Sequence, residues 1–420
     1  MELNFWPFKK SGAFTVGKTV NASAISGLFG RQQTFSGKWL SDVDTLAVSA
    51  VFACVRNMSE DIAKLKPRLY LRDGDGKLNL VQGHPLAKLF RRPNDFQTWF
   101  QFVEMCMMSL LMRGNAYVVL KRNGRGEIVK MIPVHPSRIT IMEAYDGGLF
   151  YRVTSAGPFQ TSQIGEAHIA VPQEDMMHLR LMAPDGVVGL SPLNFAKECV
   201  GIGLVSEEYQ ARLLGSGARP GGVLTHPNRL TKEVADRLRE NWREMNEGIS
   251  NAGKTAVLEE GMKWEALGMS SVDAEFMASR RFTVEEIARF FRVPPHIVGD
   301  LSRSTNNNIE SQSTEYLTNS LMPHLERIES SLARAFDLGP EYEIEFDTWK
   351  LLRGDVKSRF AAYTQAKQSG IMTTNELRER EGLGKVPGGD VLLEPLNMAA
   401  PGGAPASSTL PNGGSGANGT

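Results

Sequence analysis

The chain has 420 residues, and its 47 lysine and arginine residues balance 47 aspartate and glutamate residues, so its formal net charge is zero. A chain of this length predicts two to four domains of roughly 100–200 residues each, which bury a core without disulfides. The neutral charge excludes a global positive field, so any contact with nucleic acid must be local. No apolar run approaches the roughly 20 residues that span a bilayer, and the N-terminus lacks the pattern of a secretory signal. We therefore expect neither a membrane-spanning role nor secretion.

Residue types that carry catalysis or bind metals form no recognisable pattern. Cys54, Cys106 and Cys199 are far apart, which predicts buried free thiols in a reducing compartment. The seven histidines show no HxH or HExxH spacing, and there is no GxSxG motif. We predict no metal site, no cofactor and no catalytic residues, and expect that the protein is not an enzyme.

In chain order, residues 1–40 are rich in Gly, Ser, Thr and Lys and predict an arm that is either mobile or ordered by a neighbouring subunit. Apolar residues at steps of three and four then predict an amphipathic helix that ends before Pro67. Its stripe consists of Val48, Val51, Val55, Met58, Ile62 and Leu65. Alternating patterns predict two β-hairpins, at 68–81 around an Asp-Gly turn and at 115–134 around an Asn-Gly turn, with a helix at 98–112 between them.

The middle of the chain predicts two helices that flank a small module. Ser191-Pro192 starts the first helix, because proline is favoured in a first helical turn. A β-α-β-β unit follows, with its helix starting at Thr231 and its strands at 222–225, 255–258 and 263–267. Asp273 can cap the second helix, which we expect to end at Pro294-Pro295.

Beyond this module, residues 301–308 are too polar to form core and predict a loop. The longest helical pattern, 317–336, follows and contains Pro323, which predicts a kink near 319–323. A strand at 342–346 and helices at 355–368 and 374–381 come next, the last capped by Thr373 or Thr374. From residue 399 the composition predicts a disordered tail.

Two local features leave alternative functions open. Gly248–Thr255 matches the phosphate-binding pattern GxxxxGK[ST], but it follows a helix and precedes a strand, the reverse of the order in a nucleotide-binding P-loop. A P-loop ATPase therefore rests on Gly253, Lys254 and Thr255 alone. A monomeric nucleic-acid-binding module would rest on Arg280, Arg281 and Arg303, of which the first two give one helix a basic edge near the polar loop.

Several segments together carry a family resemblance. They occur in the order SAVFAC at 49–54, HPLAKLFRRPN at 84–94, LLMRGNAYVVLKRNGRG at 110–126, GLSPL at 189–193, GARPGGVL at 217–224, NAGKTAVLEEGMKW at 251–264, IARFFRVPPHIVG at 287–299 and GIMTTNELREREGL at 370–383. With the polar loop and the proline-containing helix behind it, this set resembles the portal proteins of long-tailed double-stranded DNA phages over roughly residues 40–395.

The resemblance implies an α+β fold with portal-type architecture, assembled as a dodecameric ring at one capsid vertex, through which DNA is packaged and ejected. The implied parts are an N-terminal arm (1–40), a wing (41–190), a stem helix (191–216), a clip (217–270), a second stem helix (271–297), a tunnel loop (298–308), a kinked helix and returning wing strand (309–346), a helical crown (347–390) and a disordered tail (391–420).

The resemblance also implies functional residues and partners. The tunnel loop would present Ser302, Arg303, Ser304, Thr305, Asn306, Asn307 and Asn308 to DNA, the stem would add Arg280 and Arg281, and the clip would dock terminase or an adaptor through Arg237, Arg239, Glu240 and Arg243. The expected partners are other copies of the chain, double-stranded DNA without sequence preference, the terminase large subunit, the major capsid and scaffold proteins, and a head-completion protein. The expected location is the virion, after assembly in the host cytoplasm, with no membrane contact.

Overall fold

The computed structural model describes residues 16–19, 32–35, 39–81, 83–144, 147–155, 157–165, 167–215, 222–226, 231–246, 262–266, 282–299, 312–348 and 356–393. The chain divides into two compact units, Met1–Asp347 and Thr348–Thr420. Among the described residues, no helix combines the length and the apolar character that crossing a membrane requires.

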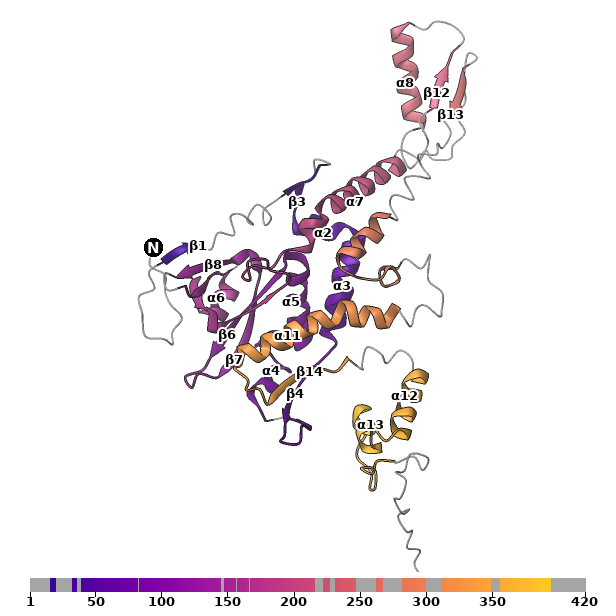
Figure 1. Ribbon diagram of the computed structural model, residues 1–420. Helices are drawn as coiled ribbons and strands as arrows, with labels where there is room; N and C mark the ends of the chain where they lie inside the picture. The colour runs from indigo at the N-terminus through magenta and orange to yellow at the C-terminus, as the bar shows by residue number, and fades with distance from the viewer. Residues whose placement is uncertain are drawn as a thin grey trace, which may run out of the picture. The chain divides into compact units, whose positions relative to one another are not determined.

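Two helices form the centre of the first unit (Figure 1). The predicted stripe lies on α3 (Ser49–Ala63), whose Val51 and Ile62 are fully buried where α3 packs on α5 (Trp99–Arg113). A capping box formed by Thr98 and Gln101 starts α5, and the left-handed Gly114 ends it. Each large apolar side chain buried here contributes about 1.5–3 kcal/mol to folding. Both predicted helices are therefore confirmed.

The strands around these helices form three larger sheets. Their orders are β14-β4-β5, β11-β6-β7 and β1-β8-β9-β10. The strands are β1 (Val16–Thr19), β4 (Pro67–Arg72), β5 (Leu78–Leu80), β6 (Asn115–Arg122), β7 (Ile128–Val134), β8 (Ile139–Ala144), β9 (Leu149–Thr154), β10 (His168–Pro172), β11 (Met176–Arg180) and β14 (Tyr342–Phe346). The predicted strand at 342–346 is confirmed, and it pairs with the first hairpin in antiparallel register, Ile344 opposite Leu69.

Short elements connect these sheets and helices. They are β2 (Gln32–Gln33), β3 (Trp39–Leu40), α2 (Asp42–Ala47), α4 (Pro85–Leu89), the 3-10 turns Pro136–Arg138, Gln173–Asp175 and Pro295–Val298, and α6 (Pro158–Ile164). One cluster of buried side chains in the sheets includes Tyr117, Ile132, Tyr151 and Val171. This cluster ties the β6 sheet to the β8 sheet.

Both predicted hairpins are confirmed, but the Asn-Gly pair does not form a two-residue turn. The amide of Gly126 donates to the carbonyl of Asn123 at 3.0 Å, and Gly126 has φ of 82°. The left-handed residue is thus the second glycine of the NGRG sequence, and the ladder shifts register between Lys121 and Arg122. A turn followed by a left-handed glycine is the longer alternative to the two-residue connection.

The sheet containing β8, β9 and β10, and strand β11, were not anticipated from the sequence. The arm also differs from the prediction, because β1 pairs antiparallel with β8 of the same chain, Val16 opposite Ala144. This short strand pairs with the edge of β8 that faces away from β9. Part of the arm therefore has secondary structure without a neighbouring subunit.

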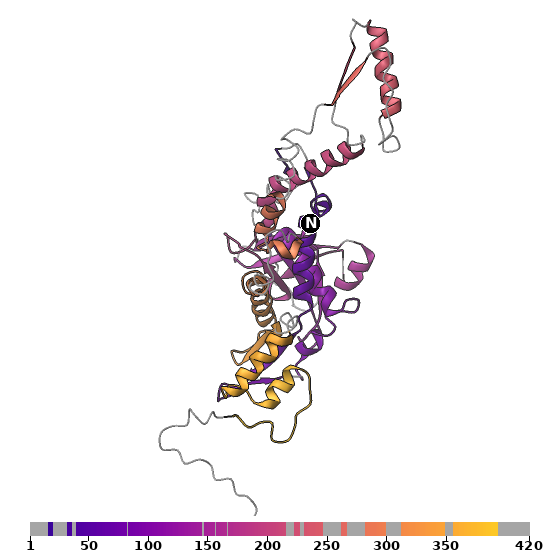
Figure 2. The same cartoon turned by 90° about the vertical axis from the view of Figure 1, so that its right-hand side faces the viewer.

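The predicted first stem helix is confirmed as α7 (Pro192–Gly215). Of the second, residues 282–290 are described and helical; the helix ends four residues before Pro294, because Arg292 takes a left-handed conformation with φ of 57°. In the β-α-β-β unit, β12 (Gly222–Thr225) pairs antiparallel with β13 (Lys263–Ala266), and α8 (Lys232–Asn246) lies beside them (Figures 1 and 2). The predicted strand at 255–258 lies outside the described residues.

The long helix behind the predicted loop changes geometry close to Pro323. Residues Tyr316–Leu321 form a π-helical segment that continues into α11 (Met322–Ala335). Proline has no amide hydrogen for the preceding turn, and π-helical turns are a recognised cause of kinks. At the position of the predicted kink, 319–323, the structure thus has a π-helical segment just before the proline.

The second unit contains α12 (Val356–Gln368) and α13 (Thr374–Arg380), which lie side by side in Figures 1 and 2. Glu381 joins them, because its Oε1 accepts a hydrogen bond from Tyr363 Oη at 2.9 Å and forms an ion pair with Arg359, 2.9 Å from Nε. Thr373 caps α13 through a capping box with Glu376, so of the two caps considered, Thr373 is correct. The predicted tail from 399 lies outside the described residues.

Candidate functional site

The predicted DNA-contacting side chains lie mostly outside the described residues. This is true of Ser302, Arg303, Ser304, Thr305, Asn306, Asn307 and Asn308 of the loop, of Arg280 and Arg281, and of the GxxxxGK[ST] segment 248–255. In the clip, Arg237 and Glu240 are exposed on α8, and Arg239 and Arg243 belong to the same helix. The structure therefore informs chiefly on how these segments are anchored.

Helix α3 holds both ends of the segment that contains the predicted loop. Asn57 Nδ2 donates to the carbonyl of Ile297 at 2.8 Å, just before the segment, and Tyr316 Oη donates to Asp61 Oδ2 at 3.2 Å, just after it. Asn57 and Asp61 are four residues apart, so they share one helix face. The chain on either side of the segment is therefore held on one face of α3.

A second bond closes the base of the same segment. Ser320 in the π-helical segment donates to the carbonyl of Arg292, where the second stem helix ends. Burial and the charge of Arg292 both lower the pKa of the Arg327 guanidinium. Burial and then Arg327 and Arg292 lower the pKa of His324 to about 4, so the imidazole is neutral at pH 7. Arg292 and Arg327 thus lie close enough to each other to affect the pKa of the groups around them.

Helix α7 and the helix at 282–290 are joined along their inner faces. The Cys199 thiol lies 2.9 Å from Glu286 Oε2, to which it donates. Burial and this carboxylate raise the pKa of Cys199 to about 12, so the sulfur stays a neutral donor. At Gly203, an added Cβ would be 3.5 Å from Val48 and 3.8 Å from Thr283, so α7 approaches both closely. All three cysteines are buried and free, as predicted.

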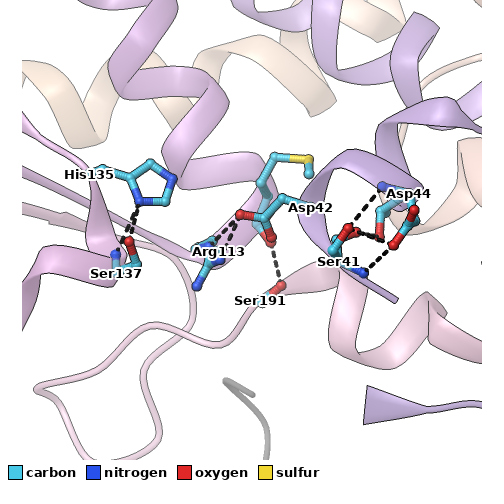
Figure 3. A network of polar contacts seen from close by, with 9 residues as sticks. Ser41, Asp42, Asp44, Arg113, His135, Ser137 and Ser191 are labelled. Carbon is cyan, nitrogen blue, oxygen red and sulfur yellow. Dashed lines mark hydrogen bonds and ion pairs between the residues drawn. The ribbon is translucent and has the colours of Figure 1, made fainter. Parts of the chain in front are cut away.

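Polar contacts connect the ends of α2, α5 and α7 (Figure 3). Arg113, the last residue of α5, donates to Asp42 Oδ2 through Nε at 2.9 Å and Nη2 at 2.6 Å. Ser191, which precedes α7, donates to the carbonyl of Met112 at 2.6 Å. Ser41 caps α2 in a capping box with Asp44. These contacts therefore hold together the end of α5 and the starts of α2 and α7.

The GNAY and GLSPL segments meet at a buried side chain. Asn115 Nδ2 donates to the carbonyl of Gly189 at 2.7 Å, and Asn115 Oδ1 accepts the Gly189 amide at 2.8 Å. His178 Nε2 lies 3.0 Å from the same Oδ1, and Tyr151 Oη lies 3.3 Å from His178 Nδ1. Because Oδ1 only accepts, His178 donates from Nε2 and accepts at Nδ1.

Sequence reasoning missed the anchors Asn57 and Asp61 and the role of His178. The signal for the first pair was available, since two polar residues at positions i and i+4 stand on a helix whose other residues are largely buried. The signal for His178 was not, because His178 and its partner Tyr151 lie on strands that were not predicted. Over the described part of the chain, no three His, Cys, Asp or Glu residues come together as metal ligands.

Comparison with known proteins identifies this arrangement. The family model for the phage portal protein matches residues 49–382. The chain belongs to the phage portal protein family. It is 31% identical over 401 residues to the portal protein of Enterobacteria phage HK97, covering 93% of this chain and 92% of that one. It is also 31% identical to a probable portal protein of Streptomyces phage phiC31, over 88% of this chain and 82% of that one.

A solved structure supports the same fold assignment. The chain resembles a protein in the neck of a native gene transfer agent particle, computed with C12 symmetry, with a TM-score of 0.57 and 21% identity. The alignment covers 90% of this chain and 97% of that one. The mixed helix-and-sheet fold predicted from the sequence is therefore that of a portal protein.

Proposed function

We propose that this protein forms the portal of a phage or phage-like particle, a ring of about twelve copies at one capsid vertex. DNA would pass through the ring during packaging and ejection without sequence preference. The wing would contact the capsid and scaffold, and the clip would dock the terminase large subunit and then a head-completion protein. Assembly would occur in the host cytoplasm. The chain would perform no chemistry of its own.

The observation that carries this proposal is the alignment of nearly the whole chain with portal proteins of similar length. An alignment that covers 93% of this chain and 92% of the HK97 portal protein leaves out little of either chain. A shared fragment would suit many roles, whereas agreement over the full architecture supports the role of the whole molecule.

The physics of the chain is consistent with a DNA channel. Each phosphate that a protein neutralises adds affinity through counterion release, so a strongly basic lining would stall moving DNA. A chain with zero net charge and a Ser, Thr and Asn loop meets the need for weak contact. The loop ends are held on α3 through Asn57 and Asp61, which supports a loop aimed by a rigid element.

The native mass tests the proposal. Twelve copies of the 46.3-kDa chain give about 556 kDa, which light scattering measures and particle images of the same fraction check for a central hole. We expect a ring near this mass, formed by the chain alone or with scaffold protein added. Persistence as a monomer under both conditions, with or without ATP hydrolysis, would overturn the portal assignment.

A further inference from the structure

Helix α7 is apolar on more of its circumference than this chain covers. Its inner face is buried at Ala196, Cys199 and Val200 against neighbouring elements of the same chain. Beside that face, Phe195, Ile202 and Val205 remain exposed by 56%, 49% and 37%. Phe195 and Ile202 are seven residues apart and Val205 three further on, so all three form one row along the helix. We call these three residues the α7 row.

The second stem helix carries an apolar row of its own. Phe282 and Phe290 are exposed by 55% and 38%, whereas Ile287, Ala288 and Phe291 of the same helix are buried. Because Cys199 binds Glu286 and Gly203 lies against Thr283, the inner faces of the two helices hold each other. Each helix of the pair therefore leaves one apolar row exposed.

Both rows carry charge: the α7 row holds Glu198, and the second row holds Arg289 together with Glu285 and Glu286, of which Glu286 accepts the Cys199 thiol. Glu198 is three residues after Phe195 and four before Ile202, so it shares their face of α7. Arg289 is seven residues after Phe282, so it lies on the same side of its helix as Phe282. Arg289 is exposed on the surface of its helix. The carboxylate of Glu198 accepts the amide of Phe35 at 2.9 Å through Oε2, and further lone pairs are available for a second donor.

The apolar surface at Glu198 is enlarged by the arm. Phe35, whose amide Glu198 holds, has a side chain that is 97% exposed. Large apolar side chains gathered on one exposed surface mark an interaction site more often than a solvated face. Two apolar rows, one with Glu198 and the other with Arg289, point to a partner that carries the complementary pattern, and this chain itself carries it.

We propose that the α7 row of one copy packs against the Phe282–Phe290 row of the next copy, with Glu198 paired to Arg289 across the contact. This inference rests on the proposed portal function, because it names the interface that builds the ring. The two rows are different surfaces, so the contact is head-to-tail, and repetition around a rotation axis closes it. Each copy contacts one neighbour through its α7 row and the other neighbour through its Phe282–Phe290 row.

Mixing two charge-reversal variants of the full chain tests this directly. Glu198→Arg places two bases at every contact, and Arg289→Glu places two acids there, so we expect each variant alone to lower the ring fraction at least about tenfold. In an equimolar mixture, copies that alternate around the ring restore an opposite pair at every contact. We expect the mixture to assemble like the unmodified protein, as measured by light scattering and particle images.

The controls separate this interface from other effects. Arg125→Glu and Glu143→Arg make the same reversals at exposed positions of the wing, and should assemble normally alone. If either single variant folds poorly by circular dichroism, the double variant Glu198→Arg/Arg289→Glu replaces it, and it should form rings by itself. Rings from the single variants at the unmodified level, or no rescue by either the mixture or the double variant, would overturn the interface. Failure of the unmodified chain to form any ring would instead overturn the portal function.

Discussion

Asn115 shows how one buried amide can connect the wing to the stem. It is 2% exposed and satisfies both the amide and the carbonyl of Gly189, while His178 and the Arg113 carbonyl use its remaining capacity. The backbones approach so closely that a Cβ on Gly189 would be 2.2 Å from the Gly114 carbonyl oxygen. This contact needs glycine at both positions, which accounts for the GNAY and GLSPL segments.

We expect Asn115→Ala to destabilise the protein by about 2–4 kcal/mol, because it leaves several buried polar groups without partners. Urea unfolding followed by circular dichroism measures this. Asn79→Ala, which removes an exposed hydrogen bond to Asp73, should change stability by less than about 0.5 kcal/mol. A similar small effect at both positions would show that the buried amide is not a structural connection.

Glu329 predicts a pH dependence of stability with an unusual sign. Its Oε1 accepts the amide of Phe346 at 3.0 Å, which links α11 to β14. Burial, with the charges of Glu326, Glu345 and Glu343 adding to it, raises the pKa of Glu329 from 4.5 to about 7. The folded state therefore binds a proton that the unfolded state releases between these values, and stability falls as pH rises from 4.5 through 7.

We expect Glu329→Gln to match the unmodified protein near pH 4 and to exceed it in stability at pH 8, since glutamine keeps the acceptor without the charge. Urea midpoints measured at pH 4, 6 and 8 test this. His178 contributes in the opposite direction, because burial lowers its pKa to about 3 and stability is lost as pH falls from 6.5 toward that value. Comparison of the two proteins at each pH cancels the His178 contribution. Parallel pH profiles for both proteins would contradict the assignment.

At the scale of elements, the anchors on α3 predict how the loop base moves. Asn57→Ala and Asp61→Ala each remove one hydrogen bond to a segment distant in sequence, worth about 0.5–1.5 kcal/mol for the first and more for the charged second. Hydrogen exchange should accelerate roughly 2–10-fold at 295–299 in the first variant and at 316–321 in the second, with α5 unchanged. Equal acceleration throughout α3 and α5 would indicate general destabilisation instead.

The same scale shows what the sequence predicts and what it leaves open. Helices α3, α5 and α7 were predicted because their apolar stripes and caps are local signals. Strands β8 to β11 were missed because their pairing and burial depend on distant partners, as with Met176 opposite Val119. The position of the left-handed glycine in NGRG was not predictable either, since two glycines compete and the register of the whole ladder decides between them. The anchors at Asn57 and Asp61 depend on contacts about 240 residues away in sequence.

For the whole molecule, the function of the loop should be separable from assembly of the ring. Shortening residues 301–308 leaves the two anchors of the loop base and the stem rows in place, so rings should form at the unmodified level. DNA packaging or the retention of packaged DNA should fall, because the segment proposed to meet DNA is missing. Packaging assays with purified rings, capsids and motor measure this. Intact packaging and retention would exclude the loop from the channel.

Docking of the terminase should be separable from ring formation and from the function of the loop. Arg237, Arg239 and Arg243 lie on α8 with Glu240. Charge pairs at the rim of an interface control association more than folding, so Arg237→Glu, Arg239→Glu and Arg243→Glu should slow terminase binding and steepen its loss with salt, without changing ring mass or melting temperature. Binding kinetics on immobilised rings measure the association rate.

Because the loop lies far from α8 in sequence, the shortened-loop protein should bind terminase normally and serves as the matched control. Unchanged binding across all three α8 variants would move the docking surface to another part of the molecule, while leaving the ring interface through Glu198 and Arg289 untouched.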